Sequence, residues 1–82
     1  MSDNYVVITR DNCTFCTQAK MLLTRFDQEY TEFNVHEHPV FRTFLKTQGL
    51  HTVPQVYRNG QLIGGYEELA ETFARQLELF DR

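Results

Sequence analysis

The sequence lacks the features that would mark a membrane, nucleic-acid-binding or secreted protein. No apolar run approaches the roughly 20 residues of a membrane-spanning helix. Neither charge dominates, because the formal net charge of the 82 residues is −3 and both signs are mixed along the chain. We therefore expect no membrane and no nucleic-acid partner. Asp3 and Asn4 stand where a signal peptide would be basic, so we expect a cytoplasmic protein.

Cysteine, proline and glycine are scarce, with two, two and four residues, and tryptophan is absent. Two cysteines cannot form the disulfide framework of a small secreted domain, so in a cytoplasmic chain they favour a redox or metal role. A hydrophobic content of 41% argues against a disordered chain. We expect a single domain over residues 1–82 that acts as a monomer.

Four short segments are predicted to be β-strands from their β-branched, aromatic or alternating residues: residues 4–9, 29–35, 55–58 and 61–63. Asn59-Gly60 joins the last two and is a strong signal for a type I′ hairpin. This turn indicates that the last two strands pair antiparallel.

Three segments carry apolar residues at helical spacing: residues 14–26, the stretch with Val40, Phe41, Phe44 and Leu45, and the stretch with Leu69, Phe73 and Leu77. Pro39 is expected at the first position of the second helix, and Gly49 just beyond its end. The order βαβαββα predicts an α/β fold, with a mixed four-stranded sheet flanked by three helices on its two faces. Charged residues such as Glu32 are expected on solvated surfaces.

The Cys13-Thr14-Phe15-Cys16 motif lies between the first strand and the first helix. Residues three apart on a helix share one face, with Cβ atoms roughly 5–6 Å apart, so the thiols can form and break a disulfide with little backbone movement. Cys13 stands at the helix start, where free N–H groups favour a thiolate, and Arg10 adds a cation. Such surroundings lower a cysteine pKa from about 8.5 to about 3.5–7.5. The pattern predicts thiol–disulfide exchange.

Two other interpretations of the cysteines stay open. One is an inert, buried pair on the helix. The other is a zinc site with His36 and His38, although their spacing does not match that of zinc fingers.

Two further motifs follow the cysteines. Thr52-Val53-Pro54-Gln55 predicts a cis Val53–Pro54 bond that leaves the Val53 backbone free beside Cys13, although a simple turn is the alternative. The second motif, residues 64–68, places two glycines before a helix whose first N–H groups suit a carboxylate. Here the alternative is an ordinary turn from strand to helix with acidic residues in its first turn.

Together the three motifs, in this order and at this spacing, resemble those of the small dithiol glutaredoxins, and the match runs from Tyr5 through Leu77. This resemblance implies a thioredoxin fold and glutathione-dependent reduction of protein disulfides and glutathione mixed disulfides. It implies glutathione as co-substrate without a metal, and it adds ribonucleotide reductase to the expected partners. Two alternatives within the fold are a redoxin reduced by thioredoxin reductase and a glutaredoxin that holds a [2Fe–2S] cluster.

The resemblance also assigns site residues by position. It implies that Cys13 is the nucleophile, that Cys16 is the resolving cysteine, and that Arg10 stabilises the thiolate and glutathione. The remaining glutathione-binding candidates are Phe15, Thr52, Val53, Pro54, Gly65, Tyr66 and Glu67, with Arg42 and Gln55 as weaker candidates for its glycyl carboxylate.

Four positions depart from the family pattern. Thr14 and Phe15 replace the usual proline and tyrosine between the cysteines, and Glu67-Glu68 replaces two aspartates at the last helix.

Overall fold

The computed structural model describes residues 3–80, and for residues 78–80 the backbone alone. Its elements are β1 (Tyr5–Thr9), α1 (Thr14–Arg25), β2 (Tyr30–Asn34), α2 (Val40–Thr47), β3 (Gln55–Arg58), β4 (Gln61–Gly64) and α3 (Tyr66–Phe80). The predicted order βαβαββα is confirmed. None of these helices is both long enough and apolar enough to cross a membrane.

The four strands form one mixed sheet in the order β2-β1-β3-β4. β1 pairs parallel to β2, as a crossover through α1 requires, and antiparallel to β3. β3 and β4 form the predicted antiparallel hairpin. Its turn residues Asn59 and Gly60 both have positive φ angles, 52° and 82°, which is the signature of a type I′ turn.

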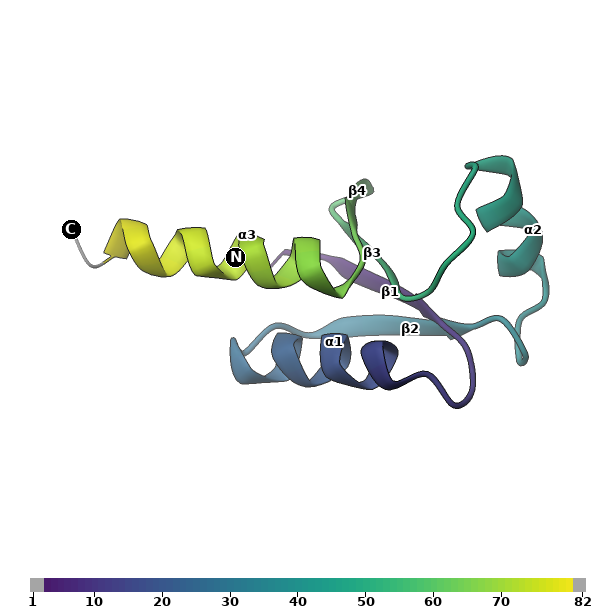
Figure 1. Cartoon of the computed structure of the whole chain (residues 1–82), viewed down its shortest axis with the longest axis horizontal. Helices are drawn as coiled ribbons and strands as arrows, with labels where there is room; N and C mark the ends of the chain where they lie inside the picture. The colour runs from purple at the N-terminus through teal and green to yellow at the C-terminus, as the bar shows by residue number, and fades with distance from the viewer. Residues whose placement is uncertain (1–2, 81–82) are drawn as a thin grey trace.

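Alternate residues of the sheet face two separate hydrophobic clusters. Tyr5 and Val7 of β1 face the cluster formed with α1 and α3, where Phe26 and Phe73 stack with ring centroids 4.4 Å apart. Ile8 faces the smaller cluster beneath α2. Figure 1 shows α1 and α3 beside each other, with α2 separate from them. Helices therefore cover both faces, as the sequence predicts.

The end of α2 forms a Schellman cap. Gly49 has a φ of 71°, and the N–H groups of Gly49 and Leu50 donate to the carbonyls of Lys46 and Leu45 at 3.0 and 2.9 Å. The predicted C-terminal stop at Gly49 is therefore confirmed. Pro39 lies one position earlier than predicted, as the N-cap of α2 rather than its first helical residue.

Two apolar residues lie outside the core that their helical spacing predicts. Val40 is 69% exposed, although the next residue of α2, Phe41, packs against the cluster beneath that helix. Leu77 is 50% exposed, whereas Leu69 and Phe73 of the same helix are buried. α3 extends past the sheet in Figure 1, so its last turns have no strand to cover.

Candidate active site

Cys13 is the N-cap of α1. Its backbone is extended (φ −121°, ψ 104°), and its Sγ accepts the Cys16 N–H at 3.1 Å. The Cys13 sulfur thus takes the place that a serine or aspartate oxygen takes at other helix starts, where unpaired N–H groups favour negative charge. The two cysteines form a disulfide, with their Cα atoms 5.2 Å apart.

The two sulfurs of this disulfide differ in accessibility. Cys13 is half-buried, whereas Cys16 points into the protein and is 2% exposed. Only the Cys13 side of the disulfide is therefore accessible from outside the protein.

The loop before β3 lies against the Cys13 sulfur. The Val53–Pro54 peptide bond is cis, as predicted, and the Val53 carbonyl oxygen lies 3.9 Å from Cys13 Sγ. No backbone hydrogen bond within residues 3–80 uses the Val53 N–H or carbonyl. Both groups are therefore free for a partner beside the disulfide.

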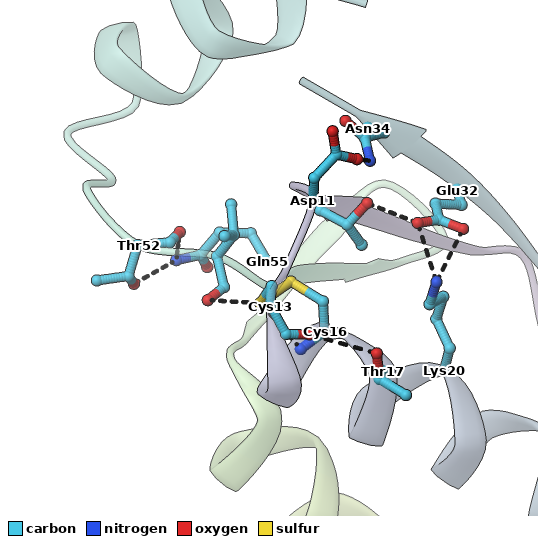
Figure 2. Close-up of a disulfide and its surroundings, with 11 residues drawn as sticks. Asp11, Cys13, Cys16, Thr17, Lys20, Glu32, Asn34, Thr52 and Gln55 are labelled. Atoms are coloured by element: carbon cyan, nitrogen blue, oxygen red, sulfur yellow. Dashed lines mark hydrogen bonds and ion pairs between the residues drawn. A yellow bond between two sulfur atoms is a disulfide. The ribbon is translucent and has the colours of Figure 1, made fainter. Parts of the chain in front are cut away.

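Gln55 holds this loop in place. Its side chain is buried (5% exposed), and its amide nitrogen donates to the Thr52 carbonyl at 3.0 Å and to the Thr52 hydroxyl at 3.2 Å. Figure 2 shows this pair on one side of the disulfide. The sequence makes Gln55 a weak candidate for the glycyl carboxylate of glutathione, but its side-chain amide donates to Thr52 inside the protein.

The start of α3 lies next to Pro54. A Cβ built on Gly65 would lie 3.6 Å from the Pro54 carbonyl oxygen, so little space separates the two segments. The Gly65 N–H donates to the Glu68 carboxylate at 2.7 Å, which is one half of a capping box. Phe15 and Tyr66 bridge α1 and α3, with ring centroids 6.1 Å apart.

A polar network behind the disulfide was missed from the sequence. The buried Thr9 hydroxyl donates to Glu32 at 2.6 Å, and Glu32 forms an ion pair with Lys20 at 3.1 Å. Glu32 and Lys20 line a hollow of about 600 Å³ together with both cysteines; Figure 2 shows the pair on the other side of the disulfide from Thr52. Glu32 is thus not a simply solvated charge, since strand alternation turns it toward α1.

Two other predicted glutathione-binding residues, Arg10 and Glu67, have exposed side chains. Arg10 is exposed and lines hollows on both sides of the motif. Glu67 is exposed and makes no side-chain hydrogen bond to any described residue. Within the described residues there is no group of three or more His, Cys, Asp or Glu side chains that could hold a metal ion.

Comparisons with known proteins identify the family. The glutaredoxin family model matches residues 5–63. Glutaredoxin 3 of Escherichia coli K12 is 32% identical over 73 residues, which cover 88% of each protein. The hybrid peroxiredoxin hyPrx5 of Haemophilus influenzae is 30% identical over 90% of this chain, but the chain spans only 31% of that longer protein.

A solved structure with the same fold is the buckwheat glutaredoxin–glutathione complex, which is 23% identical with a TM-score of 0.78. The match covers 90% of this chain and 71% of the buckwheat chain. Because the sequence match, the thioredoxin fold and the Cys13–Cys16 pair agree, this chain belongs to the glutaredoxin family of thiol oxidoreductases.

Proposed function

We propose that the chain reduces protein disulfides and glutathione mixed disulfides with electrons from glutathione. The observation that carries this proposal is the position of Cys13 Sγ, which lies at a helix N-terminus and 3.9 Å from the Val53 carbonyl, a group that no backbone N–H within residues 3–80 uses. A peptide-like substrate that pairs with Val53 would bring its own cysteine sulfur next to Cys13. Glutathione, a tripeptide with a central cysteine, meets this requirement.

The remaining predicted residues have roles that follow from their positions. The cysteinyl unit of glutathione pairs with Val53 between Thr52 and Pro54. Its γ-glutamyl carboxylate meets the free N–H groups that begin α3, at Tyr66 and Glu67, which follow Gly65. Arg10 attracts the thiolate and the anionic tripeptide, and the exposed ring of Phe15 covers the substrate sulfur from the other side.

The proposed cycle uses both cysteines. The Cys13 thiolate attacks a substrate sulfur, so that a Cys13–substrate disulfide forms and the first substrate thiol leaves with a proton. Cys16 then loses its proton and attacks Cys13, which releases the second thiol and leaves the Cys13–Cys16 disulfide. One glutathione opens this disulfide at Cys13, and a second removes the first as oxidised glutathione.

The location and partners of this activity belong to the same proposal. We place a single-domain monomer in the cytoplasm, where thiols remain reduced, and ribonucleotide reductase among its disulfide substrates. Membership of the glutaredoxin family supports glutathione as the electron donor. A redoxin reduced by thioredoxin reductase is the alternative, and it would turn over with thioredoxin reductase instead of glutathione.

Two cysteine variants test the assigned roles. Cys13→Ser is expected to lose all exchange, because it removes the attacking sulfur. Cys16→Ser is expected to keep turnover of a glutathione mixed disulfide, which needs one thiol, and to lose most reduction of a protein disulfide. Equal losses for the two variants with both substrates would contradict the assignment. Thr17→Ser, a conservative change beside Cys16, is the control and is expected to alter neither activity.

A further inference from the structure

A basic hollow lies beside Val53, on the side from which the chain enters the cis-proline loop. Its volume is about 490 Å³, and Arg10, Arg42 and Lys46 are among the residues that line it together with Val53. No aspartate or glutamate whose side chain is described lines the hollow. It therefore gathers three of the eight Lys and Arg residues of a chain whose net charge is −3.

No described acidic side chain forms an ion pair with these cations. The ion pairs among the described residues are Lys20–Glu32 and Arg75–Glu71, and neither includes a residue of the basic hollow. Unpaired charges of one sign in a concave surface attract ligands of the opposite sign. The hollow thus suits a ligand that carries negative charge.

The opposite flank of Val53 has the opposite charge. Beyond Pro54 the loop meets the start of α3, where the exposed Glu67 and Glu68 lie. Along the direction of the chain, Val53 therefore lies between the basic hollow and this acidic flank. A bound peptide would experience a different potential on each side of its cysteine.

Backbone chemistry sets the direction of such a peptide. No backbone group within residues 3–80 pairs with the Val53 N–H or carbonyl, whereas Pro54 has no N–H to offer. One residue exchanges both hydrogen bonds with a single partner residue only in an antiparallel pair. The partner residue is the substrate cysteine, because Cys13 Sγ lies 3.9 Å from the Val53 carbonyl. Residues after that cysteine then run toward the basic hollow, and residues before it run toward Glu67.

We propose that the chain selects protein disulfides in which acidic residues directly follow the attacked cysteine. This inference rests on the proposed function, since it concerns the same site. The three cations exceed what the single glycyl carboxylate of glutathione needs, so an acidic side chain can be accommodated in addition. Acidic side chains before the cysteine would instead face the carboxylates of Glu67 and Glu68, unlike the α-carboxylate of glutathione, which meets the backbone N–H groups of the same helix start.

The test measures one chemical step and needs no glutathione. Three peptides carry one cysteine each as a disulfide with neutral 2-mercaptoethanol. They have two glutamates after the cysteine, the same two before it, or glutamines in both places. Reduced Cys16→Ser is mixed with each peptide, and mass spectrometry follows the adduct. The Cys13 thiolate forms a disulfide with the peptide sulfur, and 2-mercaptoethanol leaves and takes up a proton.

The peptide with glutamates after its cysteine is expected to react about tenfold faster than the one with glutamates before it at low ionic strength. Because the charges are exposed, this ratio is expected to fall below about threefold near 1 M salt. The glutamine peptide is expected between the two. Equal rates for all three peptides, or a faster reaction with preceding glutamates, would overturn the inference.

Charge variants locate the effect. Lys46→Glu in the Cys16→Ser background is expected to remove most of the rate ratio, because it places a carboxylate inside the basic hollow. Arg75→Glu makes the same change in charge on α3, where Arg75 pairs with Glu71 away from the site, and is expected to preserve the ratio. An equal loss of the ratio in both variants would indicate a net-charge effect and contradict the inference.

Failure of the proposed function gives a different result. If wild-type protein reduces no mixed disulfide with glutathione while the peptide ratio persists, the electron donor is wrong and the peptide selectivity stands. If glutathione supports turnover and the ratio is absent, only the selectivity is wrong. If Cys16→Ser forms no adduct with any peptide, the role of Cys13 is refuted and the selectivity falls with it.

Discussion

Replacing Tyr57 by phenylalanine is expected to stabilise the protein. The Tyr57 ring packs in the cluster beneath α2, with its centroid 6.0 Å from that of Phe44, and its hydroxyl is the single buried side-chain N or O atom among the described residues without a hydrogen-bond partner. An unsatisfied buried polar group costs about 1–3 kcal/mol, whereas Tyr57→Phe keeps the ring and removes only the hydroxyl.

The same burial has a consequence for pH dependence. Desolvation raises the pKa of Tyr57 above its usual value of 10.0, because the phenolate is disfavoured inside the protein. The unfolded chain therefore loses this proton at lower pH than the folded protein. The contribution of the protonated Tyr57 to the free energy of unfolding is therefore fully present below about pH 10 and is lost as the pH rises further. Tyr57→Phe is expected to remove this pH-dependent contribution.

Urea unfolding of the oxidised protein at pH 7 checks the magnitude. A gain of about 1 kcal/mol corresponds to a rise in the urea midpoint of about 0.3–1 M, or in Tm of about 4–8 °C, for a domain of this size. Tyr30→Phe is the control, since the Tyr30 hydroxyl is not a buried, unpartnered atom among the described residues. A loss of more than about 1 kcal/mol in Tyr57→Phe would refute the reasoning by showing that the hydroxyl has a partner.

Three further predictions concern Arg10 and the turn from β4 into α3. Arg10→Ala is expected to lower the thiolate fraction of reduced Cys13 at neutral pH, seen in ultraviolet thiolate absorbance; an unchanged titration would remove Arg10 from the site. Glu68→Ala is expected to cost about 1 kcal/mol in urea unfolding, because it removes the cap on the Gly65 N–H, and a cost no larger than that of Glu71→Ala would contradict this. Gly64→Ala is expected to destabilise by more than about 1 kcal/mol, since Gly64 has a φ of 128° and an added Cβ would lie 2.9 Å from Glu68; an unchanged urea midpoint would contradict it.

Most of the fold could be predicted because local signals agree with the global arrangement. The Asn59-Gly60 turn, the stop at Gly49 and the alternation of apolar residues each specify structure within a few residues. Leu77 was misplaced because the same kind of local signal was used for it. Helical spacing reports which face is apolar, but not how far the sheet extends beneath that face.

The sequence predicts the contacts between residues of the three motifs. It does not predict contacts between polar residues that lie outside the motifs and far apart in the chain. The prediction of Cys13 beside Val53 followed from the order of the motifs. The Thr9–Glu32–Lys20 network joins β1, β2 and α1, so neither its partners nor its position behind the cysteines is encoded by neighbours in the sequence. The basic hollow likewise joins the loop after β1, α2 and the cis-proline loop. Its charge becomes visible only once the chain is folded.

The most direct test of the central claim is turnover of a small glutathione mixed disulfide with two electron supplies in parallel. One contains glutathione and glutathione reductase, and the other contains thioredoxin reductase. The proposed function predicts rapid turnover with the glutathione supply, loss of that turnover in Cys13→Ser, and little turnover with thioredoxin reductase. Turnover with thioredoxin reductase alone would contradict it, and would make the chain a redoxin in which Arg10 and Tyr66 have no role toward glutathione.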